Sequence, residues 1–179
     1  ELPLLSALAG ALGSAVIPAI AADKKAGLAE LCRETRTLYH LIFPLSIVLL
    51  LTAQYWFPVV FDAKFSSSVP LFNTFLLLTV AHLLFARTIL VALDDTRLVP
   101  FFALIGLVLQ LVFGFPLAAE YGLLGIAVAA VLAFSLEKLG LIIYVKAKHN
   151  ISWQAYTPWK WWLFYSLALL AAFAWTLAV

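Results

Sequence analysis

Six long apolar runs follow one another along this chain, and their length limits what the chain can fold into more than any other feature. They occupy residues 2–22, 38–61, 69–93, 98–117, 122–145 and 161–179. The hydrocarbon core of a bilayer is roughly 30 Å thick, so a helix that rises ~1.5 Å per residue crosses it in about 20 residues. The sequence therefore predicts an all-α, polytopic membrane helix bundle with about six transmembrane helices.

The overall composition excludes a water-soluble domain. Hydrophobic residues make up 65% of the chain and charged residues 11%, with a mean hydropathy of +1.08, whereas soluble domains are about 45–50% apolar and about 25% charged. The net charge of +2 is too small to indicate a nucleic-acid partner. Cys32 is the only cysteine, and there is no methionine, even at position 1. We therefore expect residues 1–179 to form one transmembrane domain, as a fragment of a longer protein.

Basic residues alternate between the polar connections. Since Lys and Arg concentrate on the cytoplasmic side of membrane proteins, the basic connections after the first, third and fifth runs are predicted to be cytoplasmic. The first connection, residues 23–40, has apolar residues at helical spacing. This pattern predicts either an amphipathic helix on the membrane surface or the solvated start of the second span. The basic residues of the three odd connections are Lys24, Lys25, Arg33, Arg36, Arg97, Lys146, Lys148 and Lys160.

The third run, residues 69–93, carries polar side chains at membrane depth. Asn73, His82 and Arg87 lie within it, and such residues cost several kcal/mol in lipid unless they face protein, water or the interface. On a continuous helix, Asn73, Val80, Arg87 and Asp94 recur at every seventh position and form one stripe. A polar stripe on a membrane helix is typical of a face that meets other protein, and it gives the first indication of a transporter.

The fourth and fifth runs contain further candidates. Gln110 lies in the fourth run, and the adjacent Glu137 and Lys138 lie in the fifth, where neighbours on a helix are expected not to face each other. Arg87 and Glu137 lie at comparable depth and can either pair or extend to the headgroups. An arginine retained inside suits a phosphate, because its fork of donors matches phosphate oxygens. His82 can join a proton relay or make one interhelical hydrogen bond, and Gln110 can make the same kind of hydrogen bond.

Small residues recur along one side of the fifth run. They are Gly122, Gly125, Ala129 and Ala133, and this spacing predicts close packing against another helix. Elsewhere the sequence shows no metal-ligand spacing, no nucleophile–base set and no glycine-rich phosphate loop. We therefore expect no metal, no cofactor and no catalytic residues.

Several phrases together resemble the polysaccharide flippases. They are LPLLSALAGALGSAVIPAIAADKKAGLAELCRETR, FDAKFSSSVPLF, ARTILVALDDTRLVPFFALIG and PLAAEYGLLGIAVAAVLAFSLEKL, which between them extend over most of residues 1–146. Their order and spacing are similar to those of the C-terminal lobe of a Wzx-like flippase, in the multidrug/oligosaccharidyl-lipid/polysaccharide exporter superfamily. Asp62 stands where that family often has glycine, and Gln110 where it often has asparagine.

The resemblance implies transport of polyprenyl-pyrophosphate-linked oligosaccharide outward across the plasma (inner) membrane, for cell-surface polysaccharide synthesis. It also implies a two-lobe, 12–14-helix parent whose N-terminal lobe is the missing partner, alongside membrane lipid and the lipid-linked oligosaccharide. Two alternatives stay open: a multidrug exporter of the same superfamily, and a membrane enzyme acting on lipid-linked sugars. The enzyme is disfavoured because the outer connections are very short. The substrate-path candidates are Arg87, Asn73, Lys138, Glu137, His82 and Gln110.

Overall fold

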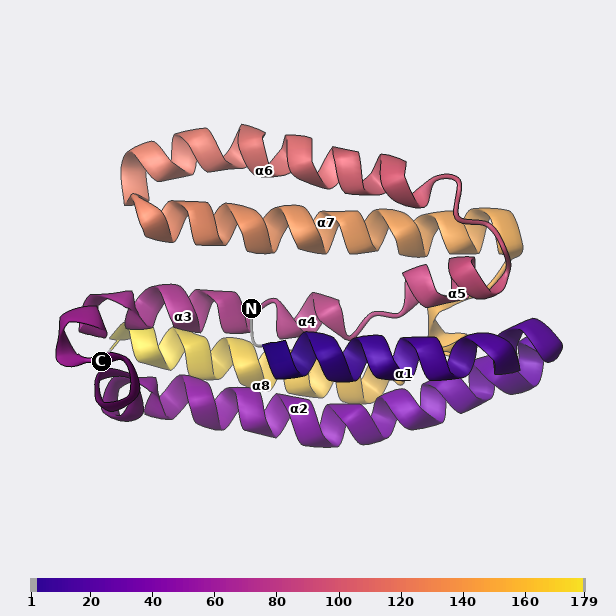
Figure 1. Ribbon diagram of the computed structural model, residues 1–179, viewed down its shortest axis with the longest axis horizontal. Coiled ribbons are helices and arrows are strands. Elements are labelled where there is room, and N and C mark those ends of the chain that lie inside the picture. The colour runs from indigo at the N-terminus through magenta and orange to yellow at the C-terminus, as the bar shows by residue number, and fades with distance from the viewer. Residues whose placement is uncertain (1–2, 179) are drawn as a thin grey trace.

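The computed structural model describes residues 3–178, and this part of the chain folds into helices and short connections without any β-strand (Figure 1). The α-helices are α1 (Pro3–Ala22), α2 (Lys24–Phe61), α3 (Val69–Leu76), α4 (Thr79–His82), α5 (Ala86–Ala92), α6 (Val99–Tyr121), α7 (Leu123–His149) and α8 (Trp159–Ala178). Two short 3-10 turns, η1 (Ala63–Ser68) and η2 (Trp153–Ala155), lie in the connections. Six helical stretches of this part of the chain are long and apolar enough to cross a membrane: α1, α2, α6, α7, α8 and residues 64–82, which join η1, α3 and α4. This confirms the predicted all-α, multi-pass bundle.

The first polar connection is the solvated start of α2, and it forms no separate surface helix. Asp23 caps α2, because its side chain accepts hydrogen bonds from the backbone N–H groups of Lys25 and Ala26 at 2.9 and 3.1 Å. The helix then continues for 38 residues, about 57 Å at ~1.5 Å per residue. That length exceeds the hydrocarbon core by several turns, so the basic beginning of α2 extends beyond the membrane.

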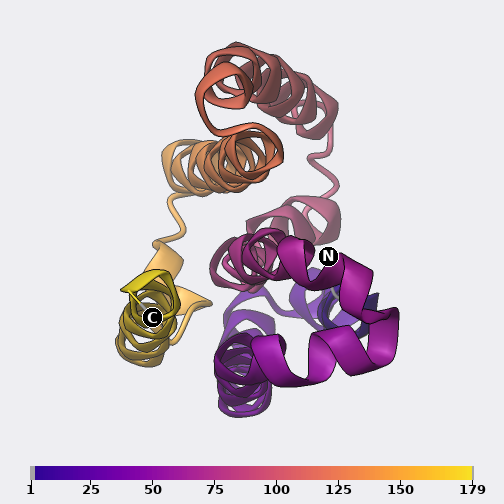
Figure 2. The ribbon, with the colours of Figure 1, turned by 90° about the vertical axis from the view of Figure 1, so that its left-hand side faces the viewer.

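The helix packing has two parts, one around α1 and α2 and one formed by the α6–α7 hairpin. α1 packs against both α2 and α5, and α8 packs against α2. α6 and α7 form an antiparallel hairpin that contacts the remainder mainly through α7, on α3 and α5. Figures 1 and 2 show α6 as the outermost helix, and Gly106 is its only buried residue among the described part. The other described helices therefore leave the wide apolar surface of α6 uncovered.

The small-residue stripe of α7 packs as predicted over three of its four members. Gly125, Ala129 and Ala133 are buried, and a Cβ atom on Gly125 would overlap the Leu117 carbonyl group of α6. Gly122 is different: it is exposed, with φ +60°, and forms the turn between α6 and α7. The stripe thus explains how closely the two helices of the hairpin approach.

The odd connections meet at one end of the bundle, on the right in Figure 1. Lys24, after α1, donates a hydrogen bond from Nζ to the backbone oxygen of His149, after α7, at 3.3 Å. Asp95, after α5, pairs with both Lys148 and His149 at 2.8 Å. The structure therefore gathers the basic connections as their alternation predicts. That this end faces the cytoplasm stays a prediction.

Candidate functional site

The third span is interrupted, and the prediction of one continuous helix over residues 69–93 is wrong. α3 ends at Leu76, a single four-residue turn forms α4, and the chain leaves helical geometry around Leu83–Phe85 before α5 begins at Ala86 (Figure 1). Residues 71–93 contain neither proline nor glycine, so no local signal marks the break. The residues at the break, from Leu83 to Ala86, are buried, and the non-helical backbone is therefore enclosed by protein, as membrane depth requires.

Two side chains from distant helices hydrogen-bond to carbonyl groups near this interruption. Tyr39 of α2 donates its hydroxyl to the Leu83 carbonyl at 3.0 Å, and its side chain is fully buried. Trp162 of α8 donates Nε1–H to the Val80 carbonyl, also at 3.0 Å. A break in a membrane helix frees backbone groups that water cannot reach, so neighbouring helices must supply partners. α2 and α8 perform this role.

The interruption also removes the expected polar stripe. Asn73 in α3 is buried, with 5% of its surface exposed, whereas Arg87 in α5 and Asp94 after it are exposed. The seven-residue spacing defines one face only on an unbroken helix, and the break changes the rotation between α3 and α5. The expectation that Asn73, Val80, Arg87 and Asp94 share a stripe is therefore wrong.

Glu137 and Lys138 form an ion pair, contrary to the expectation that adjacent helix residues do not face each other. The Lys138 Nζ atom lies 3.6 Å from Glu137 Oε1, because both side chains are long enough to bend toward one another outside the helix. Lys138 is buried, and its ammonium group lies over the Phe134 ring at 4.5 Å. Arg87 forms no ion pair in the described part of the chain, and it lies on α5, which packs against the helix that carries Lys138. The local charge is two cations and one carboxylate.

Phe134 links this charged group to two further candidates. The His82 ring stacks on Phe134 with centroids 4.5 Å apart, and its Nδ1 lies 3.2 Å from the Leu78 carbonyl. Gln110 and Glu137 line a cavity of about 340 Å³ between α3, α6 and α7, to which Phe134 also contributes. The structure thus places His82 and Lys138 against the Phe134 ring, and Gln110 and Glu137 along the cavity that this ring helps to line.

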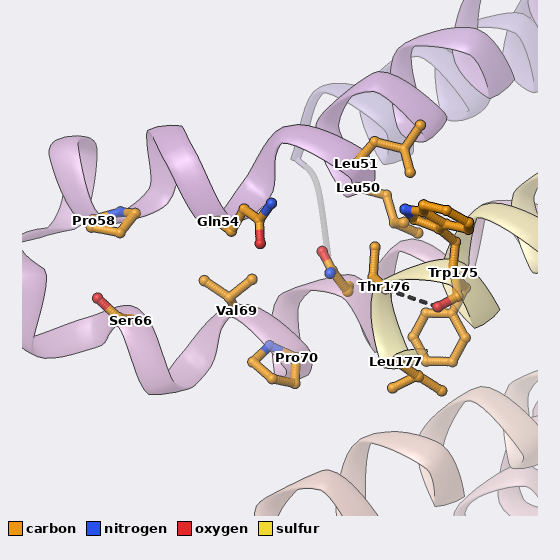
Figure 3. Close-up of a pocket in the computed structure, with 12 residues that line it drawn as sticks. Leu50, Leu51, Gln54, Pro58, Ser66, Val69, Pro70, Trp175, Thr176 and Leu177 are labelled. Carbon is orange, nitrogen blue, oxygen red and sulfur yellow. Dashed lines mark hydrogen bonds between the residues drawn. The ribbon is translucent and has the colours of Figure 1, made fainter. Parts of the chain in front are cut away.

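Asn73 belongs to a second cavity, of about 340 Å³, between α2, α3 and α8 (Figure 3). Its lining is neutral, with amide and hydroxyl groups among apolar side chains. Gln54 extends from α2 toward Val69 and Pro70 of α3 (Figure 3). The Oδ1 atom of Asn73 is buried and has no hydrogen-bond partner. The structure therefore separates Asn73 from the five other candidates.

A cluster centred on Asp95 was missed by the reasoning from sequence. The Asp95 carboxylate lies 2.8 Å from Lys148 Nζ and 2.8 Å from His149 Nε2, and it accepts a hydrogen bond from the Tyr144 hydroxyl at 3.1 Å. The hydrogen bonds from Lys148 and His149 lower the pKa of Asp95 to about 2. The only local signal is the i, i+4 spacing of Tyr144 and Lys148. This cluster fastens the connection between α5 and α6 to the end of α7.

Comparison of the chain with protein-family models, curated proteins and solved structures finds no match. The fold therefore defines the class by itself: a multi-pass membrane protein built as an all-α helix bundle. Two features of this bundle stand out. One is the interrupted span, whose carbonyl groups accept hydrogen bonds from Tyr39 and Trp162. The other is the set of charged residues Arg87, Glu137 and Lys138 on the packed helices α5 and α7.

Proposed function

We propose that this chain forms one lobe of a membrane transporter. The interrupted α3–α4–α5 span carries the proposal, because transporters commonly build substrate and ion sites from discontinuous membrane helices. A purely structural span gains nothing from lost helical hydrogen bonds, whereas here the break is buried and Tyr39 and Trp162 bond to carbonyl groups near it. The exposed apolar surface of α6 is available to a second lobe of the same protein.

The substrate class we propose is polyprenyl-pyrophosphate-linked oligosaccharide, moved across the plasma membrane. Arg87 of α5 and Lys138 of α7 place two cations on helices that pack against each other. The Arg87 guanidinium is exposed and forms no ion pair among the described residues, so its fork of donors is available to phosphate oxygens. Glu137 offsets part of this charge, which favours release as well as binding. The proposal assigns no catalytic chemistry to the chain.

The test is translocation of a fluorescent polyprenyl-pyrophosphate-linked sugar by the full-length protein in liposomes. If Arg87 binds the headgroup, Arg87→Ala loses a charged hydrogen bond of about 1.5–3 kcal/mol, so the rate falls roughly 10- to 100-fold. Arg87→Lys retains the charge without the fork and keeps part of the activity. Arg97→Ala is the matched control, because Arg97 is exposed on a polar connection, and it should transport normally.

Three outcomes contradict parts of this proposal. Normal transport by Arg87→Ala refutes the phosphate contact. Transport of an organic cation such as ethidium, without transport of the lipid-linked sugar, favours the multidrug exporter. Covalent conversion of the lipid-linked sugar without its movement favours a membrane enzyme. Protein levels of each variant in the liposomes separate these outcomes from a failure to fold.

A further inference from the structure

A basic groove lies where the solvated start of α2 meets the beginning of α8. Its volume is about 550 Å³, and it opens to the surface at the end of the bundle where the basic connections gather. α2 contributes Arg33, Arg36 and Cys32, and the segment around the start of α8 contributes Trp159, Lys160 and Trp161. None of the candidate transport residues discussed above lines this groove.

The charge of the groove is strongly positive. Three of its lining residues are cationic, and no Asp or Glu lines it. The adjacent Glu34 carboxylate binds Arg33 through Nε at 3.0 Å, and both side chains are well exposed, so the terminal amino groups of Arg33 remain available. The Arg36 guanidinium lies over the Trp161 ring at 5.2 Å, which holds it in place without neutralising it.

The beginning of α8 adds to this positive potential. α8 is a 20-residue helix that starts at Trp159. The N–H groups of Trp161 and Trp162 donate to the Pro158 carbonyl at 3.0 Å, whereas those of Trp159 and Lys160 have no acceptor within the helix. They carry a partial positive charge and favour anions. Three cationic residues therefore line one groove beside a helix N-terminus, and the ligand class that satisfies them is an anion with several oxygen acceptors.

The position of the groove along α8 indicates where this anion comes from. α8 is long and apolar enough to cross the membrane from Trp159 onward, so its first turn lies at the interface. Trp159 and Trp161 belong to the residue type that settles at headgroup level. Phosphate groups of lipids lie at the same depth, and basic pockets between membrane helices bind anionic headgroups. We propose that the groove binds the phosphate of an anionic phospholipid from the surrounding leaflet.

This proposal is independent of transport and is tested by lipid binding. The full-length protein in detergent is titrated with dioleoyl phosphatidylglycerol and, separately, with dioleoyl phosphatidylcholine, and bound lipid is counted by native mass spectrometry. Removing one basic residue near anionic lipid costs about fivefold in affinity. The triple variant Arg33→Gln/Arg36→Gln/Lys160→Gln should therefore bind phosphatidylglycerol on the order of 100-fold more weakly.

A matched variant removes the same charge from the same end of the bundle. Lys25→Gln/Arg97→Gln/Lys146→Gln changes three exposed basic residues that do not line the groove, and its affinity should change by less than about threefold, as expected for residues outside the contact. Cys32 gives a local readout because it lines the groove. Phosphatidylglycerol should slow its alkylation by a maleimide, measured on the Cys32 peptide, in the matched variant but not in the groove variant.

The proposal is overturned by equal losses of affinity in the two triple variants, which would indicate diffuse attraction to a basic surface. It is also overturned if phosphatidylcholine protects Cys32 as well as phosphatidylglycerol does. Displacement of phosphatidylglycerol by an equal concentration of polyprenyl pyrophosphate would overturn the phospholipid assignment and give the groove to the transported lipid. Circular dichroism of each variant in detergent checks that its helices are retained.

Discussion

Tyr39→Phe tests whether a distant hydroxyl stabilises the interrupted span. The substitution keeps the ring and removes only the oxygen that donates to the Leu83 carbonyl at 3.0 Å. Because Tyr39 and Leu83 are both fully buried, water cannot replace the lost donor. Leaving a buried acceptor unsatisfied costs about 1–3 kcal/mol, whereas double-mutant cycles in a membrane protein give an average of about 0.6 kcal/mol and a maximum of about 1.7 kcal/mol for one hydrogen bond. We therefore expect the free energy of unfolding to fall by about 1–2 kcal/mol.

The assay compares Tyr39→Phe with Tyr165→Phe. The Tyr165 hydroxyl lies 2.8 Å from Nδ1 of His40; this bond supports no group of the interruption, and its loss should cost about 0.6 kcal/mol, the average for a membrane hydrogen bond. Equilibrium unfolding in mixed micelles measures both losses. Hydrogen exchange should also become faster at residues 83–86 in Tyr39→Phe alone, because the interruption loses its support. Equal unfolding free energies for the two variants, with unchanged exchange at the break, would refute the reasoning.

Three further predictions concern orientation, helix packing and acid stability. A cysteine placed at Ser67 should react with a membrane-impermeant reagent added from outside, and a cysteine at Thr96 should not, because basic connections face the cytoplasm. Reaction at Thr96 would show that the predicted orientation is wrong. Gly125→Leu should lower the free energy of unfolding by about 1–3 kcal/mol or more, because the larger side chain overpacks against α6. Leu124→Ala should lower it by less, since Leu124 is 36% exposed. Equal losses of unfolding free energy in detergent would argue against the close contact between α6 and α7. The pKa of Asp95 is lowered from 3.8 to about 2, so the Asp95 carboxylate stabilises the fold fully above about pH 3.8 and loses this effect as the pH falls toward 2. Asp95→Asn should therefore remove this step from acid unfolding curves. An unchanged curve would contradict the role of Asp95.

The sequence by itself determined the class of fold. Twenty-residue apolar runs must become helices in lipid, because each backbone group has to be satisfied within its own segment. The alternation of basic residues likewise predicted which connections share one end of the bundle, and the contacts of Lys24 and Asp95 with the end of α7 place them together. The small residues at 125, 129 and 133 predicted the tight face of α7, because side-chain size alone limits how closely two helices approach.

Only the tertiary structure decided where the third span breaks and how the charged residues pair. Nothing between residues 71 and 93 marks the interruption; the hydrogen bonds near it come from Tyr39, 44 positions from Leu83, and from Trp162, 82 positions from Val80. The break in turn separates Asn73 from Arg87, and Glu137 pairs with Lys138. The physical reason is one of range: hydrophobic pattern is a property of neighbouring residues, whereas the partner of a freed carbonyl is chosen by which distant side chains the packed bundle brings within hydrogen-bonding distance.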